Sequence, residues 1–258
     1  MKILILFRYI ALIALILGIN LSVWAGEERL RVATEGAYPP FNFIDERGQL
    51  AGFDVDIAKA LCDALNRECE VIAVPWEQLL PKLAASDFEM IVASMAKTPE
   101  RAQLAEFTEV YYRTPHAFIG RADDSTREVT PATVRGKVLG AQRDTIQADY
   151  LRQHYQNSAV VRLTDTMPAA FELLASGEID YVLADCLLAY PFIRTDARQG
   201  FKIIGQTIPD EELSSLSYIQ VRKGDVRLRD AINRALNEIK NNGVYARISA
   251  KYFPFDIR

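Results

Sequence analysis

Apolar and polar residues alternate along the first part of the chain with two different periods. Short apolar runs within residues 30–34, 70–74 and 90–93 are typical of buried strands. From residue 54 to 65, and again after Trp76, apolar residues recur every three to four positions, as they do in amphipathic helices. Strands that alternate with helices predict an α/β fold in which a mostly parallel sheet carries helices on its faces.

A second alternation of the same kind occupies the middle of the chain, around a charged and polar turn at residues 121–128. Strands are expected at residues 116–120, 137–140, 159–163 and 181–184, with an edge strand at 202–204, and helices at residues 145–155, 167–176 and 186–195. A further strand at 217–221 and helices at 225–242 and 244–252 follow this block. We therefore expect two lobes, with the final elements returning to complete the first one.

Two segments far apart in the chain, residues 88–94 and 179–185, end in the same way. In each, a turn leads into an apolar strand that finishes on a polar residue, Ser94 in one and Asp185 in the other. Ligands of parallel α/β sheets bind beyond the carboxyl ends of the strands, so both side chains are expected at a ligand-binding edge. The loop at residues 35–41 is expected at the same edge, because it follows the first strand.

A helix start follows the strand that ends at Ser94. Thr98 is a good N-cap, and Pro99 suits the first helical position. Backbone N–H groups at such a start favour an anion, and the guanidinium of Arg101 could hold a carboxylate with two parallel hydrogen bonds. We interpret residues 94–101 as a carboxylate pocket. The alternative that these residues leave open is a capped helix with a solvated arginine.

The N-terminus has the pattern of a secretory signal peptide. Lys2 and Arg8 precede an apolar stretch at residues 11–17, and a cleavage position follows at residues 23–25. We expect removal of residues 1–25 and export to the periplasm. The alternative is an uncleaved anchor, which the shortness of the apolar stretch disfavours. Removal leaves 28 of the 30 basic residues against 34 acidic ones, with no basic stripe, which argues against a nucleic-acid partner.

The three cysteines bear on the same compartment. Cys62 falls late in an expected helix and Cys69 at the start of the next strand, so the chain can turn back between them. In an oxidising compartment these two can form a disulfide, and Cys186 would remain an unpaired, buried thiol. Three reduced thiols are the alternative. Neither His116 nor His154 lies near a cysteine pair, so we expect no zinc site, and no cofactor is indicated.

Four segments, in order and behind a signal peptide, carry a resemblance to a known family. They are GAYPPF at residues 36–41, GFDVDIA at 52–58, TPER at 98–101 and ASGEID at 175–180. The chain resembles the bacterial extracellular solute-binding proteins, family 3, of polar amino-acid ABC transporters. The resemblance covers essentially the whole mature chain. It looks closest to the lysine/arginine/ornithine- and histidine-binding branch, with opine-binding proteins as near relatives.

The resemblance implies a two-lobed periplasmic-binding-protein fold (type II), in which each lobe has a mostly parallel sheet flanked by helices. Residues 26–112 and 219–258 would form the first lobe, and residues 117–209 the second. Two crossover hinge strands, near residues 113–116 and 210–218, would join the lobes. One free amino acid would be enclosed between them.

The resemblance also implies which residues hold the backbone end of that amino acid. By matching position, Arg101 would hold the α-carboxylate, with help from Ser94 and backbone N–H groups. Asp185 would hold the α-ammonium, and Thr145 would supply a hydrogen bond from the second lobe. Ala96 stands where the family often has a small hydroxyl residue, so the carboxylate end would have one hydrogen bond fewer.

At the other end of the ligand, Tyr38 and Trp76 would enclose the side chain, and Glu35 would face its distal charge. Aromatic faces beside an arginine- or lysine-like side chain gain cation–π energy. Lys97 and Arg143 depart from the family pattern, which commonly has an aliphatic residue and a glycine there. The implied specificity therefore rests mainly on Glu35.

The implied function is that of a periplasmic substrate-binding component of an amino-acid ABC transporter. It would bind arginine, lysine, ornithine, histidine or an arginine-derived opine and deliver it to the inner-membrane permease, without itself being an enzyme. The mature chain is expected to be a monomer that is not inserted in the membrane. One alternative is an arogenate/prephenate (cyclohexadienyl) dehydratase on the same fold, with Asp144 or Glu35 as general acid. Another is a ligand-sensing module.

Overall fold

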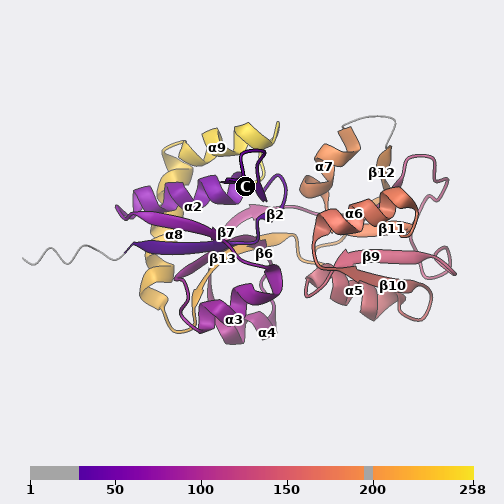
Figure 1. Ribbon diagram of the computed structural model, residues 1–258, viewed down its shortest axis with the longest axis horizontal. Helices are drawn as coiled ribbons and strands as arrows, with labels where there is room; N and C mark the ends of the chain where they lie inside the picture. The colour runs from indigo at the N-terminus through magenta and orange to yellow at the C-terminus, as the bar shows by residue number, and fades with distance from the viewer. Residues whose placement is uncertain (1–28, 195–199) are drawn as a thin grey trace, which may run out of the picture.

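The computed structural model describes residues 29–194 and 200–258 and arranges them as two lobes (Figure 1). The expected signal peptide, residues 1–25, and the end of the helix expected at residues 186–195 lie outside the described residues. Within the described residues, each lobe contains a five-stranded sheet, and a small three-stranded sheet accompanies the first lobe. No helix in this part of the chain combines the length and apolar character needed to cross a membrane.

The sheet of the first lobe has the strand order β5-β1-β6-β13-β7. Its strands are β1 (Leu30–Thr34), β5 (Cys69–Ala73), β6 (Met90–Met95), β7 (Ala105–Arg113) and β13 (Leu216–Arg222). The helices are α2 (Phe53–Ala64), the 3-10 turn η1 (Trp76–Gln78), α3 (Leu79–Ala84), α4 (Pro99–Leu104), α8 (Val226–Asn241) and α9 (Val244–Tyr252). Helices α2 and α9 cover one side of the sheet and α3 and α4 the other (Figure 1), so apolar side chains are buried on both faces.

The sheet of the second lobe has the order β10-β9-β11-β8-β12. Its strands are β8 (His116–Arg121), β9 (Val138–Gln142), β10 (Val160–Thr164), β11 (Tyr181–Asp185) and β12 (Phe201–Ile208). Its helices are α5 (Ile146–Tyr155), α6 (Met167–Ser176) and α7 (Cys186–Arg194). The expected edge position of the strand near residues 202–204 is confirmed, because β12 pairs with β8 at the end of the sheet.

In each sheet four strands run in one direction and one runs against them. The reversed strands are β13 and β8, and each is the first strand after the chain has crossed from the other lobe. The chain leaves each lobe along the direction shared by four strands of its sheet. The first strand that it forms in the other lobe therefore runs opposite to the four strands that share a direction there. The prediction of mostly parallel sheets is therefore confirmed, and the carboxyl ends of the parallel strands in both lobes face each other.

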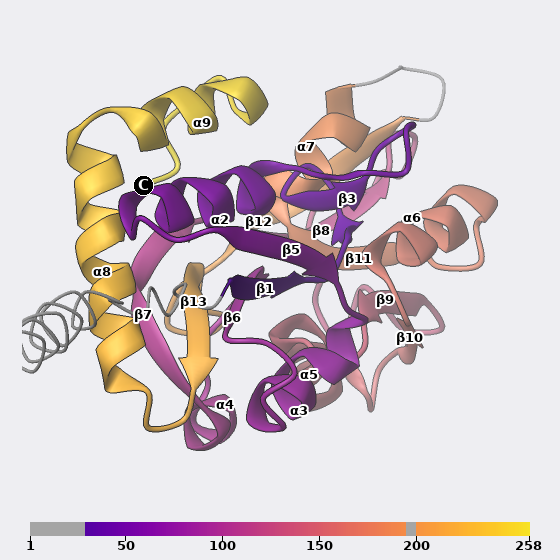
Figure 2. The same ribbon diagram turned by 60° about the vertical axis from the view of Figure 1, so that its left-hand side comes forward.

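The chain crosses between the sheets at residues 114–115 and 209–215. The two crossings lie side by side, because Thr114 N donates to the carbonyl of Ser215 at 2.9 Å. A side-chain contact adds to this pairing, since His116 Nε2 lies 3.1 Å from the carbonyl of Ser214. Helix α8, which follows the second crossing, returns to pack along β7 of the first lobe (Figure 2).

The sequence pattern did not predict two parts of the first lobe. One is β7, which follows α4 without a loop, and the other is the small sheet of β2 (Ala37–Tyr38), β3 (Asn42–Ile44) and β4 (Leu50–Ala51). Gly52 links this sheet to α2 with φ of 122°, and a Cβ there would lie 2.3 Å from the carbonyl oxygen of Phe41. This close approach requires glycine, and it fixes the loop that carries Glu35 against the start of α2.

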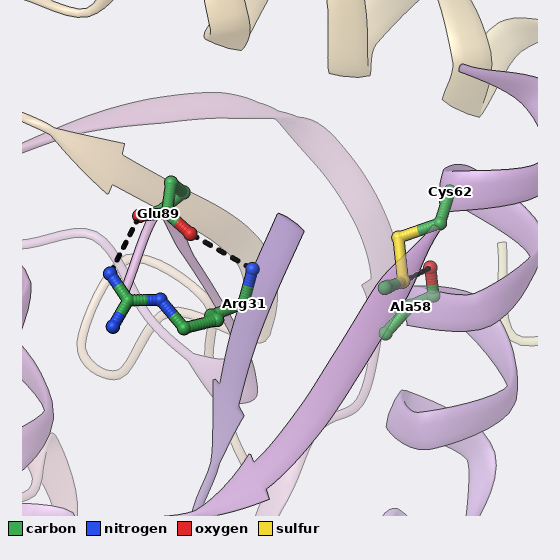
Figure 3. Close-up of a disulfide and its surroundings, with 5 residues drawn as sticks. Arg31, Ala58, Cys62 and Glu89 are labelled. Atoms are coloured by element: carbon green, nitrogen blue, oxygen red, sulfur yellow. Dashed lines mark hydrogen bonds and ion pairs between the residues drawn. A yellow bond between two sulfur atoms is a disulfide. The ribbon is translucent and has the colours of Figure 1, made fainter. Parts of the chain in front are cut away.

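The disulfide between Cys62 and Cys69 is confirmed, and it ties the end of α2 to the start of β5 (Figure 3). Figure 3 also shows, nearby in the same lobe, Glu89 bound to both the backbone N–H and the guanidinium of Arg31. Cys186 is a free thiol, as expected, but it is half-buried and not fully buried. It is the first residue of α7 and packs against the main apolar core cluster.

Candidate functional site

A cavity lies between the two lobes, at the edge where the parallel strands of both sheets end. The residues singled out by the sequence all contribute to its lining: Glu35, Tyr38, Trp76, Ser94, Ala96, Arg101, Thr145 and Asp185. The lining also contains polar residues that the sequence did not single out as ligand contacts: Thr114, His116, Gln142, Gln147, Ser214, Ser215 and Ser217. The expected residues thus line one common cavity.

Arg101 projects from the first turn of α4, which has the expected cap: Arg101 N donates to Thr98 Oγ1 at 3.2 Å. Its guanidinium donates to the carbonyls of Ala96 and Asp144, both at 2.9 Å. It also lies 5.3 Å from the centre of the Trp76 ring, where it covers one face of the indole. Burial lowers the pKa of Arg101 to about 10, so the side chain stays charged at neutral pH. Because arginine has five N–H donors, these contacts leave donors for a carboxylate.

Hydrogen bonds cross the cleft at the turn that follows β9. The carbonyl of Asp144 in the second lobe accepts from Arg101 and from Trp76 Nε1, the latter at 2.9 Å. Gln142, the last residue of β9, donates from Nε2 to Glu35 Oε1 at 2.6 Å. Three residues of the first lobe therefore contact the end of β9 and the turn after it, and the structure has a closed cleft.

Asp185 ends β11 and is 2% exposed. Its Oδ1 accepts from Thr114 Oγ1 at 2.5 Å and from the backbone N–H groups of Leu187 and Leu188 at 2.7 and 3.2 Å. The carboxylate thus both caps α7 and lines the cavity. Burial raises the pKa of Asp185 to about 7, against the lowering effect of these hydrogen bonds.

Glu35 follows β1 and is 8% exposed, so it is buried although it lies in a loop. Burial raises the pKa of its carboxyl to about 7, and the negative charge of Glu77 adds to this effect. The hydrogen bond from Gln142 acts in the opposite direction. Burial disfavours the ionised form of such a carboxyl, whereas a cation placed beside it favours that form. A cation in the cavity would therefore offset the cost of burying the charge of Glu35.

The sequence comparisons agree with this architecture. Residues 30–255 match the family model described as bacterial extracellular solute-binding proteins, family 3. The chain belongs to this family.

An L-arginine-binding protein of Pseudomonas aeruginosa is 34% identical over 243 residues, 93% of each chain. A histidine-binding periplasmic protein of Salmonella typhimurium is 29% identical over 233 residues, 89% of each chain. A solved ancestral arginine-binding protein bound to arginine has a TM-score of 0.80 at 30% identity, covering 87% of this chain and 98% of that chain.

In this family 3 solute-binding protein, Ser94 lies above a buried carboxylate that the sequence did not reveal as important. Asp54 is fully buried and accepts from Asn42 Nδ2, Ser94 Oγ and Tyr111 OH at 2.8, 2.9 and 2.7 Å. Ser94 N in turn donates to Tyr111 OH at 2.9 Å. Because both donors of Ser94 are used inside the protein, its hydroxyl is placed to accept a hydrogen bond from a ligand and not to donate one to a carboxylate.

Thr145 and Tyr38 have partners of their own within the protein. The hydroxyl of Thr145 donates to the carbonyl of Gln142 at 2.7 Å and accepts from Ala148 N at 3.2 Å, so it caps α5. The ring of Tyr38 packs against Phe41 with centres 5.8 Å apart. Burial, with smaller effects from Asp185 and other nearby acids, raises the pKa of Tyr38 well above its usual value, so the phenol is neutral.

His116 lies at the hinge, is 5% exposed and lines the cavity. Its Nε2 faces the carbonyl of Ser214, and its Nδ1 lies 3.2 Å from Gln147 Nε2. These partners assign Nε2 as the donor and Nδ1 as the acceptor, which is the neutral imidazole. Burial lowers the pKa of His116 to about 4, so the neutral form is the one present at physiological pH.

The buried carboxyls predict that the ligand-free solute-binding protein is more stable at pH 5.5 than at pH 8. The pKa values of Glu35 and Asp185 are raised to about 7 and that of Asp54 to about 6. The folded state therefore binds more protons than the unfolded state above pH 4, and stability falls as pH rises through 7. His116 has a lowered pKa and acts in the opposite sense below about pH 6.5, so it offsets part of the fall.

We take the net effect left after the His116 offset as equivalent to a pKa difference of about one unit between the folded and unfolded states, which is worth about 1.4 kcal/mol. A loss of stability of this size corresponds to a fall in Tm on the order of 5 °C between these pH values. Differential scanning calorimetry of the ligand-free protein measures it, and Glu35→Gln should flatten the slope. A Tm that rises from pH 5.5 to 8 would contradict the raised pKa values.

Proposed function

We propose that this protein is the periplasmic receptor of an amino-acid ABC transporter and that it binds a cationic amino acid in the cavity between its lobes. The observation that carries the proposal is the charge of the lining, in which Glu35 and Asp185 are acidic and Arg101 is basic. A free amino acid with a cationic side chain has the complementary set, one carboxylate and two cations. Buried charges are tolerated when they are paired, so such a ligand neutralises all three residues at once.

In this proposal Arg101 binds the α-carboxylate, while the carbonyl of Ala96 holds the guanidinium in place. Asp185 binds the α-ammonium, and the hydroxyl of Ser94 accepts a second hydrogen bond from it. The sequence-based expectation placed Ser94 beside Arg101 at the α-carboxylate. We place it at the α-ammonium, because the Ser94 hydroxyl already donates to Asp54 and can only accept from a ligand. The N-terminus of α5, capped by Thr145, faces the same cavity.

At the side-chain end, Glu35 binds the distal cation of arginine, lysine, ornithine, histidine or an arginine-derived opine. Tyr38 and the face of Trp76 not covered by Arg101 enclose the aliphatic part. Cation–π attraction to the two rings adds to the preference for a positively charged side chain. The relatives named above include arginine- and histidine-binding proteins, which supports this ligand class.

Export and delivery follow from the same proposal. Residues 1–25 act as a cleaved signal peptide, and the mature chain works in the periplasm as a monomer. Ligand binding favours closure about the crossings at residues 114–115 and 209–215. The closed form is then presented to the inner-membrane permease, which takes up the ligand.

Isothermal titration calorimetry with a panel of free amino acids tests the proposal. The purified mature protein should bind at least one of arginine, lysine, ornithine and histidine, or an N-carboxyalkyl arginine, and should bind glutamate far more weakly. The expected order follows from the Glu35 carboxylate, which attracts a distal cation and repels a distal anion. Clear heat with glutamate and none with the cationic panel would refute the proposed ligand class.

The dehydratase alternative has one observation in its favour. Because the pKa of Glu35 is raised to about 7, a fraction of this carboxyl carries a proton at neutral pH, as a general acid must. Incubation of the protein with prephenate, followed by assay for phenylpyruvate, separates the two functions. The binding proposal expects no phenylpyruvate above the uncatalysed rate.

A further inference from the structure

Gln142 provides a cross-cleft contact that the ligand-binding roles above do not use. It is the last residue of β9 and is 1% exposed. Its amide Nε2 donates to Glu35 Oε1 at 2.6 Å and to the carbonyl of Asp165 at 3.1 Å. Glu35 belongs to the first lobe, whereas Gln142 and Asp165 belong to the second, so the contact with Glu35 exists only when the lobes are together.

The surroundings of Gln142 fix which end of its amide faces Glu35. The parallel pairing of β9 with β10 places Gln142 opposite Thr164, and Asp165 follows directly. Two acceptors, a carboxylate and a carbonyl, meet at one amide position. Only the NH₂ group can satisfy both, because the amide oxygen would repel them. The hydrogen bond to Asp165 therefore presents a donor to Glu35.

A donor at this place acts on a carboxylate whose charge burial disfavours. The charged and titratable groups around Glu35 come from several elements: Glu77 of η1 raises its pKa, and Tyr38 of β2 is a neutral phenol. The amide of Gln142 counters burial by stabilising the ionised form. It also engages one carboxylate oxygen, Oε1, so the orientation of the other is fixed relative to the cavity.

We propose that Gln142 is a positioning residue for the distal-cation subsite, and that by donating to Glu35 on closure it holds this carboxylate ionised and aimed at the ligand. This inference rests on the proposed function, since it concerns the same cavity. According to this inference, the Glu35 carboxylate reaches its full attraction for a cation only after the cleft has closed. Selectivity for a cationic side chain is then coupled to the closed form that a permease would recognise.

The first test compares Gln142→Met with wild type, using arginine and its neutral isostere citrulline at pH 6 and pH 8. Loss of the amide should raise the pKa of Glu35 by about one pH unit, which costs arginine affinity about tenfold at pH 6 and about twofold at pH 8. Citrulline affinity should not show this pH dependence. A purely structural role would weaken both ligands by the same factor at both pH values, and that result would overturn the proposal.

Gln147→Met is the matched control, because Gln147 is also a buried glutamine of the cavity lining but contacts His116 and not Glu35. The ratio of the arginine affinity of Gln147→Met to that of wild type should be the same at pH 6 and pH 8. A pH-dependent ratio in this control equal to that of Gln142→Met would mean that the effect does not pass through Glu35.

The second test needs no cationic ligand and therefore separates this inference from the proposed function. Carbon-13 NMR titration of the side-chain carboxyls, with Glu35 assigned through Glu35→Gln, measures the pKa of Glu35 in the free protein and again with saturating citrulline, which should favour the closed cleft. The pKa should be higher in Gln142→Met than in wild type when the cleft is closed. An unchanged Glu35 pKa in both measurements refutes the positioning role even if arginine binds. A raised pKa in a protein that binds no amino acid refutes the proposed function but leaves the Gln142–Glu35 coupling intact.

Discussion

Replacing Arg101 by alanine is expected to weaken the binding of every amino acid by about 10²–10⁴-fold. The proposed α-carboxylate contact is common to all of them, and removal of one partner of a buried charge pair costs about 3–5 kcal/mol. The substitution also removes one of the hydrogen bonds to the Asp144 carbonyl that hold the lobes together. Calorimetry with arginine, lysine and citrulline measures the loss for each ligand.

Two further variants separate the contributions of Arg101. Arg101→Lys keeps the charge but not the planar fork, so it should recover only part of the affinity. Trp76→Phe keeps an aromatic face but removes the indole donor to the same Asp144 carbonyl, so it tests the cross-lobe contact with Arg101 intact. If Arg101→Ala weakened arginine and lysine but left citrulline unchanged, Arg101 would not be the anchor of the α-carboxylate.

Much of the fold was predictable from two features of the sequence. The period of the apolar residues indicates which segments are helices or strands, and the order of these elements along the chain indicates how they form two lobes. Helices such as α6, with its Thr166 cap, occupy the expected residues because local signals and tertiary packing agree. Strand β7 was missed because α4 ends at Leu104 and the strand begins at the next residue, leaving no loop signal between them. The strands of the small sheet were missed because two or three residues are too few to show a period.

The candidate site divides in the same way. Arg101 and Asp185 could be found from their places after parallel strands, since strand ends in α/β sheets are where ligands bind. Glu35 required the family resemblance, because a glutamate in a loop is by itself most often solvated. Gln142 and Asp54 were missed because their roles depend on partners far away in the chain. Gln142 binds Glu35 at a separation of 107 residues, and Asp54 binds Tyr111 at 57.

Glu35→Gln is expected to weaken arginine binding by about 10–100-fold while leaving citrulline within about threefold of wild type. A carboxylate facing a cation at about 4 Å is worth roughly 4 kcal/mol at an effective dielectric near 20, and desolvation removes part of this. The substituted amide has nearly the same shape and still offers an oxygen to Gln142, so cleft closure is preserved. Citrulline has no distal charge and therefore serves as the matched ligand. Calorimetry at pH 8, where Glu35 is mostly ionised, gives the largest contrast.

The two substitutions together test the assignment of the two ends of the ligand. Arg101→Ala should act on all amino acids, whereas Glu35→Gln should change the ratio of arginine to citrulline affinity. The Glu35→Gln effect should also shrink at pH 6, because part of the wild-type Glu35 is already protonated there and has lost its advantage. Equal losses for arginine and citrulline in Glu35→Gln, at both pH values, would place the distal cation elsewhere in the cavity and remove the electrostatic basis for selecting a cationic amino acid.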